Sequence, residues 1–262
     1  MNNIIRPTAL VTGGATRLGL AFANSLAQAG YDIALHYNGS ASAADLAAKN
    51  IESLGVACTT FQADLSEPNP EGLVGKVLEA HSNLTVLINS ASVYDAATIS
   101  NTNIKTLQKQ FAVNFFAPFL LTQAFAKGCS ARLDPKGVVI NILDNKISFQ
   151  QYSYASYLLS KKSLAEFTRL AAIEYAPHIR VNAIAPGVIL PGSERTSGYL
   201  AWRVEGIPLK MQGKVDHLLT AMNYLLENEF VTGQILTVDG GEGIDHQGLN
   251  AEQFNKKETL QK

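Results

Sequence analysis

The sequence predicts an α/β fold, a doubly wound parallel sheet in a single domain, and three observations support this class. Short runs that are apolar throughout alternate with helix-length segments, as in a parallel sheet covered on both faces. A glycine-rich turn joins the first apolar run to the first helical segment. Polar residues follow several runs, at the edge where such sheets bind ligands. With 262 residues and 47% hydrophobic content, the chain can bury a substantial core.

The predicted elements follow one another along the chain. Strands are expected at 9–12, 32–37, 56–63, 84–89, 138–142, 179–185 and 235–238. Helices are expected from the glycine turn to Ala29 and at 42–54, 69–81, 104–131, 153–176 and 214–228. One long irregular stretch is expected at 187–213. Residues from about 188 to 212 within it are expected to form a substrate loop. The domain is expected to cover 1–242, and 243–262 to form a polar C-terminal tail.

Composition excludes several classes of protein. A net charge of −1 offers no basic face for nucleic acid. No apolar span or leader segment is apparent, so we expect a soluble, cytoplasmic protein without membrane association. Cys58 and Cys129 lack the spacing of metal ligands, and no metal site is predicted.

The glycine-rich turn has the order Gly13-Gly14-Ala-Thr-Arg17-Leu18-Gly19. Backbone N–H groups at a helix N-terminus converge on an anion, and glycines allow it to approach. The turn therefore predicts a site for the pyrophosphate of a dinucleotide.

The end of the second strand bears on which dinucleotide binds. An NAD site places an acid there to hold the ribose 2′-hydroxyl. This chain has His36, Tyr37, Asn38 and Ser40 instead, with Arg17 nearby in the phosphate turn. The pattern favours a 2′-phosphate, and so NADP(H).

Tyr157 and Lys161 are spaced i, i+4 and share a helix face. An adjacent ammonium favours the phenolate, so we expect Lys161 to lower the pKa of Tyr157 and make it a usable general acid. The alternative is a pair of solvated polar residues.

Asn114 is expected in the middle of a helix, four residues before Pro118. Proline lacks an N–H, so the helix should kink and leave the Asn114 carbonyl free to hold water. The alternative is a kink capped by the asparagine side chain itself.

The chain resembles the short-chain dehydrogenase/reductase family from residue 9 to about residue 241. The matching motifs are Thr12-Gly13 to Gly19, Asp64-Leu65, Asn89-Ser90-Ala91-Ser92, Asn114, Tyr157-x-x-x-Lys161, Pro186-Gly187, and Thr232-Gly233 to Asp239-Gly240-Gly241. The resemblance implies a Rossmann-type sheet, an oxidoreductase and a homotetramer assembled through the helices that carry Asn114 and Tyr157.

The resemblance also implies a role for each motif. Tyr157 would donate a proton, Lys161 would hold the nicotinamide ribose, and the Asn114 carbonyl would anchor a water linked to Lys161. The implied cofactor contacts are Asp64 and Leu65 at the adenine, Asn89, Ser90 and Ala91 along the crevice, and Pro186 and Gly187 at the nicotinamide amide.

Asp144 stands where many members of this family carry a serine. A serine polarises a ketone, whereas a carboxylate repels the developing oxyanion. A carboxyl group instead suits a nitrogen-rich ring, which supplies N–H donors and a C=N bond to reduce.

Asp144, Arg17 and the His36-Tyr37 pair together resemble pteridine reductases and the related dihydromonapterin reductases. This resemblance implies that Tyr94 stacks on the pterin, and that Tyr94, Asp144 and Tyr157 bind the substrate. The alternative for Tyr94 is a loop tyrosine packed on the core. Gly39 departs from the arginine that many pteridine reductases carry at this place.

The leading hypothesis is NADPH-dependent reduction of a pteridine such as dihydromonapterin, dihydrobiopterin or dihydrofolate. A second hypothesis is a ketoreductase, for example of 3-oxoacyl thioesters, with Asp144 protonated or turned away. A third is a non-catalytic NADP(H) sensor, although such a sensor needs no proton relay.

Overall fold

The computed structural model describes residues 6–131, 136–190, 196–245 and 254. Its strands are β1 (Thr8–Val11), β2 (Asp32–Tyr37), β3 (Cys58–Gln62), β4 (Leu84–Asn89), β5 (Gly137–Ile142), β6 (Ile179–Pro186) and β7 (Ile235–Val238). They form one parallel sheet in the order β3-β2-β1-β4-β5-β6-β7. The predicted doubly wound sheet is confirmed.

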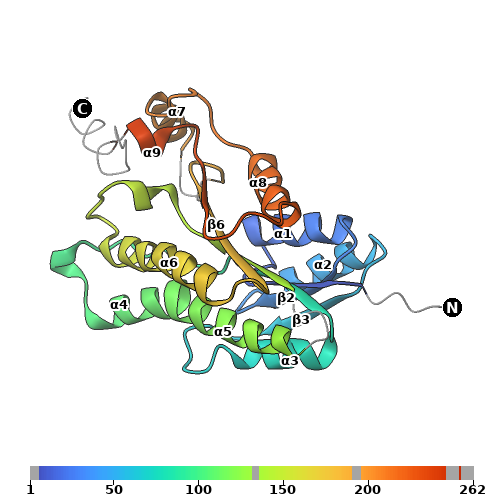
Figure 1. Ribbon diagram of the computed structural model, residues 1–262. Helices are drawn as coiled ribbons and strands as arrows, with labels where there is room; N and C mark the ends of the chain where they lie inside the picture. The colour runs from blue at the N-terminus through green and yellow to red at the C-terminus, as the bar shows by residue number, and fades with distance from the viewer. Residues whose placement is uncertain (1–5, 132–135, 191–195, 246–253, 255–262) are drawn as a thin grey trace.

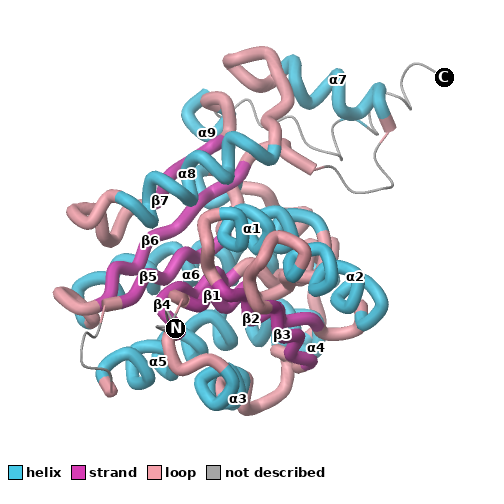
Figure 2. Tube along the Cα trace, turned by 90° about the vertical axis from the view of Figure 1, so that its right-hand side faces the viewer, coloured by secondary structure: helices cyan, strands magenta, loops and turns pink. Residues whose placement is uncertain are grey.

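Helices cover both faces of the sheet (Figures 1 and 2). One face carries α1 (Arg17–Gln28), α2 (Ala41–Glu52) and α8 (Val215–Glu227). The other carries α3 (Gly72–Ala80), α4 (Ile104–Phe111), α5 (Ala117–Ser130) and α6 (Ala155–Glu174). Adjacent strand residues point to opposite cores, since Leu10 packs with α5 and α6 while Val11 packs with α1. Both faces of the central strands β1 and β4 are therefore buried, which explains why these strands are largely apolar. The edge strands β3 and β7 are partly exposed.

The segment predicted to be irregular contains a helix, α7 (Ser197–Glu205), so that part of the prediction is wrong. The Thr196 side chain accepts a hydrogen bond from the Tyr199 N–H at 3.1 Å and caps the first turn. Trp202 on the same helix is buried. Capping and burial of one face stabilise a helix whose sequence pattern is weak.

A last short helix, α9 (Glu242–Asp245), crosses the predicted boundary after residue 242. Glu242 and Gly243 are buried, and Figure 1 places α9 beside α7. The rest of the predicted tail, except residue 254, lies outside the described residues. Among the helices described, none has the length and apolar character needed to cross a membrane.

Candidate active site

The polar residues predicted to share a crevice lie at one edge of the sheet, because all seven strands are parallel. The polar ones are Thr12, Asp64, Asn89 and Asp144, and Pro186 lies at the same edge. Strand order reverses between β1 and β4, where open α/β sheets bind their ligands. The Thr12 hydroxyl accepts the N–H groups of Ser90 at 2.9 Å and Ala91 at 3.0 Å, so it ties these two strand ends together.

The phosphate turn has the close packing that its glycines predict. Gly13 has a φ of 64°, and a Cβ there would lie 3.0 Å from the Ala91 Cα. A Cβ on the buried Gly19 would overlap the Gly13 carbonyl. The Thr16 side chain makes no capping bond, which leaves the first N–H groups of α1 to an anion. The turn fits a dinucleotide pyrophosphate.

Arg17 connects the phosphate turn to the segment after β6. Its φ of 52° is in the left-handed region, so an arginine here carries backbone strain. Its guanidinium donates to the Leu190 carbonyl at 2.7 Å. Its neighbour Leu18 packs against the core on the α1 side. The structure therefore places Arg17 between the glycine-rich turn and the predicted substrate loop.

His36 lies beneath the phosphate turn and is buried. Its Nδ1 accepts the Gly13 N–H at 3.0 Å, so Nε2 carries the proton and donates to the Ala63 carbonyl at 3.0 Å. Burial lowers the pKa of His36 and keeps the imidazole neutral. Both ring nitrogens are committed to the protein, so His36 supports the turn from below.

The remaining residues of the predicted adenosine side lie at the ends of β2 and β3. Asn38 and Ser40 are exposed, and Tyr37 packs partly against the core. The Asp64 carboxylate accepts the Ser66 hydroxyl at 2.6 Å and the Ser66 N–H at 2.8 Å, and these bonds lower its pKa. Leu65 beside it is buried. No carboxylate follows β2 before α2 begins.

Asn89 begins a buried chain of amides across the centre of the sheet. Its Nδ2 donates to Asn141 Oδ1 at 2.9 Å, and Asn141 Nδ2 donates to Thr168 Oγ1 at 3.0 Å.

At the end of β6, the Gly187 N–H donates to the Val238 carbonyl at 3.0 Å. A Cβ on Gly187 would lie 2.7 Å from the Asp239 Cβ. Close packing therefore requires glycine after Pro186.

Asp144, Tyr157 and Lys161 are brought together by β5 and α6. The Tyr157 hydroxyl donates to Asp144 Oδ2 at 2.9 Å, and Asp144 Oδ1 accepts the Lys146 N–H at 2.9 Å. The Lys161 ammonium donates to the Ile142 carbonyl at 2.8 Å and lies 5.9 Å from the centroid of the Tyr157 ring. Tyr157 and Lys161 are both buried, so the alternative of solvated surface residues is wrong.

The predicted lowering of the Tyr157 pKa is also wrong in this structure. Burial raises the pKa of Tyr157 well above 10, and the Asp144 carboxylate adds to the effect. The phenol donates its proton toward Asp144, which stabilises the protonated form. Tyr157 therefore holds its proton near neutral pH, as a general acid must before it acts.

The buried Lys161 side chain is expected to make the stability of the protein depend on pH. Burial lowers its pKa from 10.5 to about 8, so between these pH values the unfolded chain binds the proton and the folded chain does not. Stability therefore rises with pH across this window. A lowering of this size corresponds to about 3 kcal/mol. We expect Lys161→Met to lack this rise, measured by urea unfolding of both proteins over the same pH series. A wild-type minus variant difference that stays flat would contradict it.

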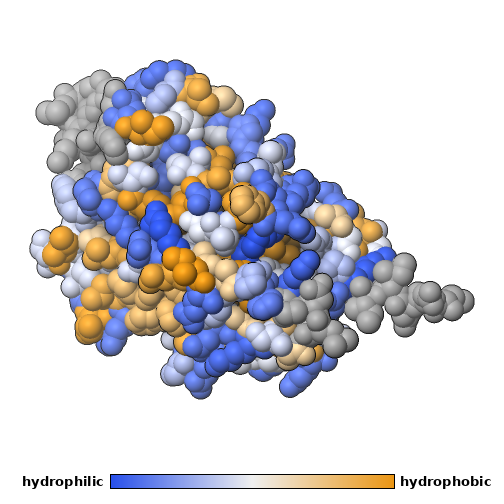
Figure 3. Space-filling view, in the orientation of Figure 1, coloured by the Kyte–Doolittle hydropathy of each residue, from blue (hydrophilic) through white to orange (hydrophobic). Residues whose placement is uncertain are grey.

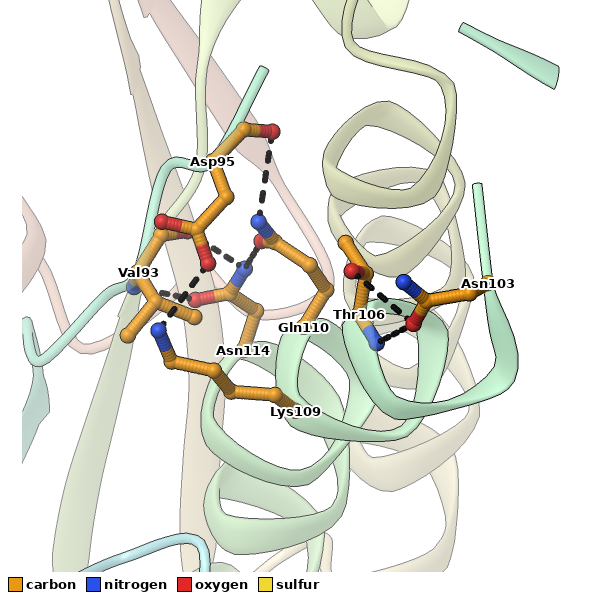
Figure 4. Close-up of polar contacts among 7 residues, drawn as sticks. All are labelled: Val93, Asp95, Asn103, Thr106, Lys109, Gln110 and Asn114. Atoms are coloured by element: carbon orange, nitrogen blue, oxygen red, sulfur yellow. Dashed lines mark hydrogen bonds and ion pairs between the residues drawn. The ribbon is translucent and has the colours of Figure 1, made fainter. Parts of the chain in front are cut away.

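Asn114 lies in a π-helical turn, η2 (Ala112–Phe116), that separates α4 from α5. The predicted irregularity before Pro118 is thus present as a π turn. The buried Asn114 side chain forms hydrogen bonds to residues outside its own helix (Figure 4). Its Oδ1 accepts the Val93 N–H at 2.9 Å and the Ser92 hydroxyl at 3.0 Å, and its Nδ2 donates to the Val93 carbonyl at 2.9 Å and Ser160 Oγ at 3.2 Å. Asn114 thereby fixes the loop after β4 against α6.

Tyr94 belongs to an aromatic group beside Asp144 and Tyr157. Its ring stacks on Tyr154 at a centroid distance of 4.3 Å and meets Tyr157 edge-on at 4.6 Å. Its hydroxyl accepts the Lys146 ammonium at 2.8 Å. Tyr94 is 42% exposed, so it is not a tyrosine packed into the core.

Sequence reasoning did not single out Tyr154 or Lys146 in this group. Spacing could have suggested Tyr154, which precedes Tyr157 by three residues, whereas Lys146 and Tyr94 are 52 residues apart and share no local signal.

A cavity of about 790 Å³ lies beside β7, and its lining does not include Asp144, Tyr157 or Lys161. Its mostly apolar lining includes Val188, Ile189, Ile207 and Leu209. It offers room for an apolar part of a ligand next to the segment that follows Gly187.

Comparison with known proteins identifies the class. Residues 13–242 match the family model described as enoyl-(acyl carrier protein) reductase. The chain therefore belongs to the short-chain dehydrogenase/reductase family and is an oxidoreductase.

Three similar proteins indicate which subgroup of the family this chain resembles. An uncharacterized oxidoreductase of Mycobacterium tuberculosis is 34% identical over 89% of this chain and 90% of that protein. Dihydromonapterin reductase of Enterobacter sp. is 28% identical over 94% of this chain and all of that protein. The crystal structure of FolM alternative dihydrofolate reductase 1 from Brucella canis, complexed with NADP, is 32% identical, with a TM-score of 0.85 over 92% of this chain and 96% of that one. These relatives confirm the predicted resemblance to the pteridine reductase-like subgroup.

Proposed function

We propose that the protein uses NADPH to reduce a C=N bond of a dihydropterin, such as dihydromonapterin or dihydrobiopterin, or of dihydrofolate. One observation carries the proposal: the carboxyl group of Asp144 lies 2.9 Å from the phenol of Tyr157. A carboxylate disfavours an oxyanion but accepts N–H groups from a nitrogen-rich ring. The names of the Enterobacter and Brucella relatives support the same substrate class.

The residues at the sheet edge fit NADP(H). Gly13, Leu18 and Gly19 would surround the pyrophosphate at the start of α1. Asn38, Ser40 and Arg17 would hold the 2′-phosphate, since no acid follows β2 to claim a 2′-hydroxyl. The other residues assigned to the cofactor are Tyr37, Asp64, Leu65, Asn89, Ser90, Ala91, Pro186 and Gly187. When bound, NADPH supplies the hydride.

The chain itself supplies the proton and the orientation. Tyr157 donates its phenolic proton to the ring nitrogen, while the adjacent ring carbon is reduced. Asp144 accepts N–H groups of the substrate and orients the Tyr157 hydroxyl. Lys161 would bind the nicotinamide ribose with its ammonium and stabilise the phenolate left after proton transfer. The Asn114 carbonyl, in the π turn, would hold the water that returns a proton.

Tyr94 and its neighbours form the proposed substrate wall. The exposed Tyr94 ring would stack on the flat pterin. In the structure one face of this ring stacks on Tyr154. The hydrogen bond from the Lys146 ammonium to the Tyr94 hydroxyl would hold the Tyr94 ring in place.

We also propose a homotetramer assembled partly through α5 and α6. Hydrophobic residues gather on this face of the molecule (Figure 3). The exposed apolar side chains here are Phe116, Phe119, Leu159, Leu170 and Ile173. A patch of this kind marks an interaction surface.

The variant Leu170→Glu/Ile173→Lys is expected to sediment as a smaller species with an unchanged circular dichroism spectrum. Leu46→Lys, on the exposed face of α2, is the control and is expected to keep the wild-type size. Sedimentation velocity checks both, and a monomeric wild type would contradict the proposal.

A substrate panel tests the proposed function. NADPH oxidation is followed with dihydrobiopterin, dihydromonapterin, dihydrofolate, folate and an acetoacetyl thioester side by side. We expect turnover with at least one dihydropterin or with dihydrofolate and little with the thioester. Consumption of the thioester alone would establish the ketoreductase alternative, and tight NADPH binding without any turnover would establish the sensor.

A further inference from the structure

A buried ion pair joins α7 to the short helix α9. Arg203 Nη2 donates to Glu242 Oε1 at 2.6 Å, and the two side chains are 5% and 1% exposed. Removing two charges from water is costly unless the geometry is good and the remaining polar atoms are also bonded. The second carboxylate oxygen of Glu242 therefore also needs a hydrogen-bond donor.

That oxygen binds the residue next to Asp144. Glu242 Oε2 accepts Asn145 Nδ2 at 2.9 Å, and the same nitrogen donates to Asp239 Oδ2 at 3.2 Å. Asp239 is fixed in turn by the N–H groups of Gly241 at 2.9 Å and Gly243 at 2.6 Å. Both amide hydrogens of the buried Asn145 are therefore committed.

Fixing Asn145 constrains Asp144, because a planar peptide bond joins the two residues. Asn145 begins the 3₁₀ turn η3 (Asn145–Ser148), and Asp144 caps this turn through the Lys146 N–H. The other Asp144 oxygen accepts the Tyr157 hydroxyl. Polar contacts thus run from α7 through Glu242 to Asn145, and the peptide bond continues the connection to Asp144.

We propose that Arg203, Glu242 and Asn145 are positioning residues that hold the Asp144 carboxyl against Tyr157. Asn145 is the direct support, Glu242 is its acceptor, and Arg203 orients Glu242. The arrangement links α7, on the substrate side, to the acid that engages the substrate. The inference rests on the proposed function, in which Asp144 is that acid.

Paired variants separate positioning from folding. A single substitution leaves a buried charge without its partner and can unfold the region. The double variant Arg203→Met/Glu242→Gln removes both charges but keeps an amide oxygen to accept Asn145. The double variant Arg203→Met/Glu242→Leu also removes both charges and keeps no acceptor. The two variants have side chains of similar size at position 242, and only glutamine can accept the Asn145 N–H.

We expect the glutamine variant to keep kcat within about threefold of wild type and the leucine variant to lose about 10- to 100-fold, as for a small misplacement of a catalytic group. The Kd for NADPH is expected to stay within about twofold in both, because cofactor contacts at the phosphate turn lie outside this set. Equal kcat in the two variants, at equal melting temperature, would overturn the proposal.

The test remains informative if pterins prove not to be substrates. The variants are then compared on whichever panel compound the wild type reduces. Crystal structures of both variants give a readout independent of activity. The Asp144 to Tyr157 hydrogen bond should persist with glutamine and open with leucine, and its persistence in both would overturn the proposal.

Discussion

Replacing Tyr157 by phenylalanine is expected to lower kcat about 10²- to 10⁴-fold, the usual contribution of a positioned general acid. The variant removes one oxygen, the donor of the 2.9 Å bond to Asp144, and keeps the ring that meets Tyr94 edge-on. NADPH affinity should change by no more than about twofold, because the phosphate turn is untouched.

Single-turnover oxidation of bound NADPH and a fluorescence titration of NADPH measure the two quantities separately. Tyr175→Phe removes a hydroxyl at the far end of the same helix and is expected to keep wild-type turnover. A Tyr157→Phe enzyme with more than about a tenth of wild-type kcat would show that another group delivers the proton.

Replacing Asp144 by serine is expected to lower turnover of a dihydropterin about 10²-fold, in line with loss of one electrostatic group from a catalytic site. Serine is too short to reach both the Tyr157 hydroxyl and the Lys146 N–H, which the two carboxyl oxygens bind at 2.9 Å each. It also lacks the charge that attracts substrate N–H groups.

The same substitution discriminates between substrate classes. A ketoreductase should tolerate or benefit from serine, because a hydroxyl donates to a carbonyl oxygen that a carboxylate repels. Steady-state kinetics with a dihydropterin and an acetoacetyl thioester provide the comparison, and Asp45→Ser on the exposed face of α2 is the control. A gain in thioester reduction without loss of pterin turnover would sink the pteridine assignment.

Residue patterns along the chain predict the sheet and the position of the crevice correctly. Central strands of a parallel sheet are largely apolar, and a glycine-rich turn between a strand and a helix can bind an anion, so these signals are local. The strands β2, β4 and β7 have the bounds predicted from the sequence. The i, i+4 spacing of Tyr157 and Lys161 likewise placed both on one buried helix face.

The electrostatics and the long-range contacts of the site depend on how the folded chain brings distant residues together. The direction of the Tyr157 pKa depends on burial and on Asp144, which arrives from β5, and neither is encoded in the spacing of Tyr157 and Lys161. Burial also turned His36 into a support for the phosphate turn, and capping turned part of a loop into α7. Arg203 and Glu242 are 39 residues apart, so the polar contacts around Asp144 exist only once the chain has folded. Local sequence patterns specify which helices and strands form. The charge states and hydrogen bonds of the site depend on which distant groups the fold buries next to one another.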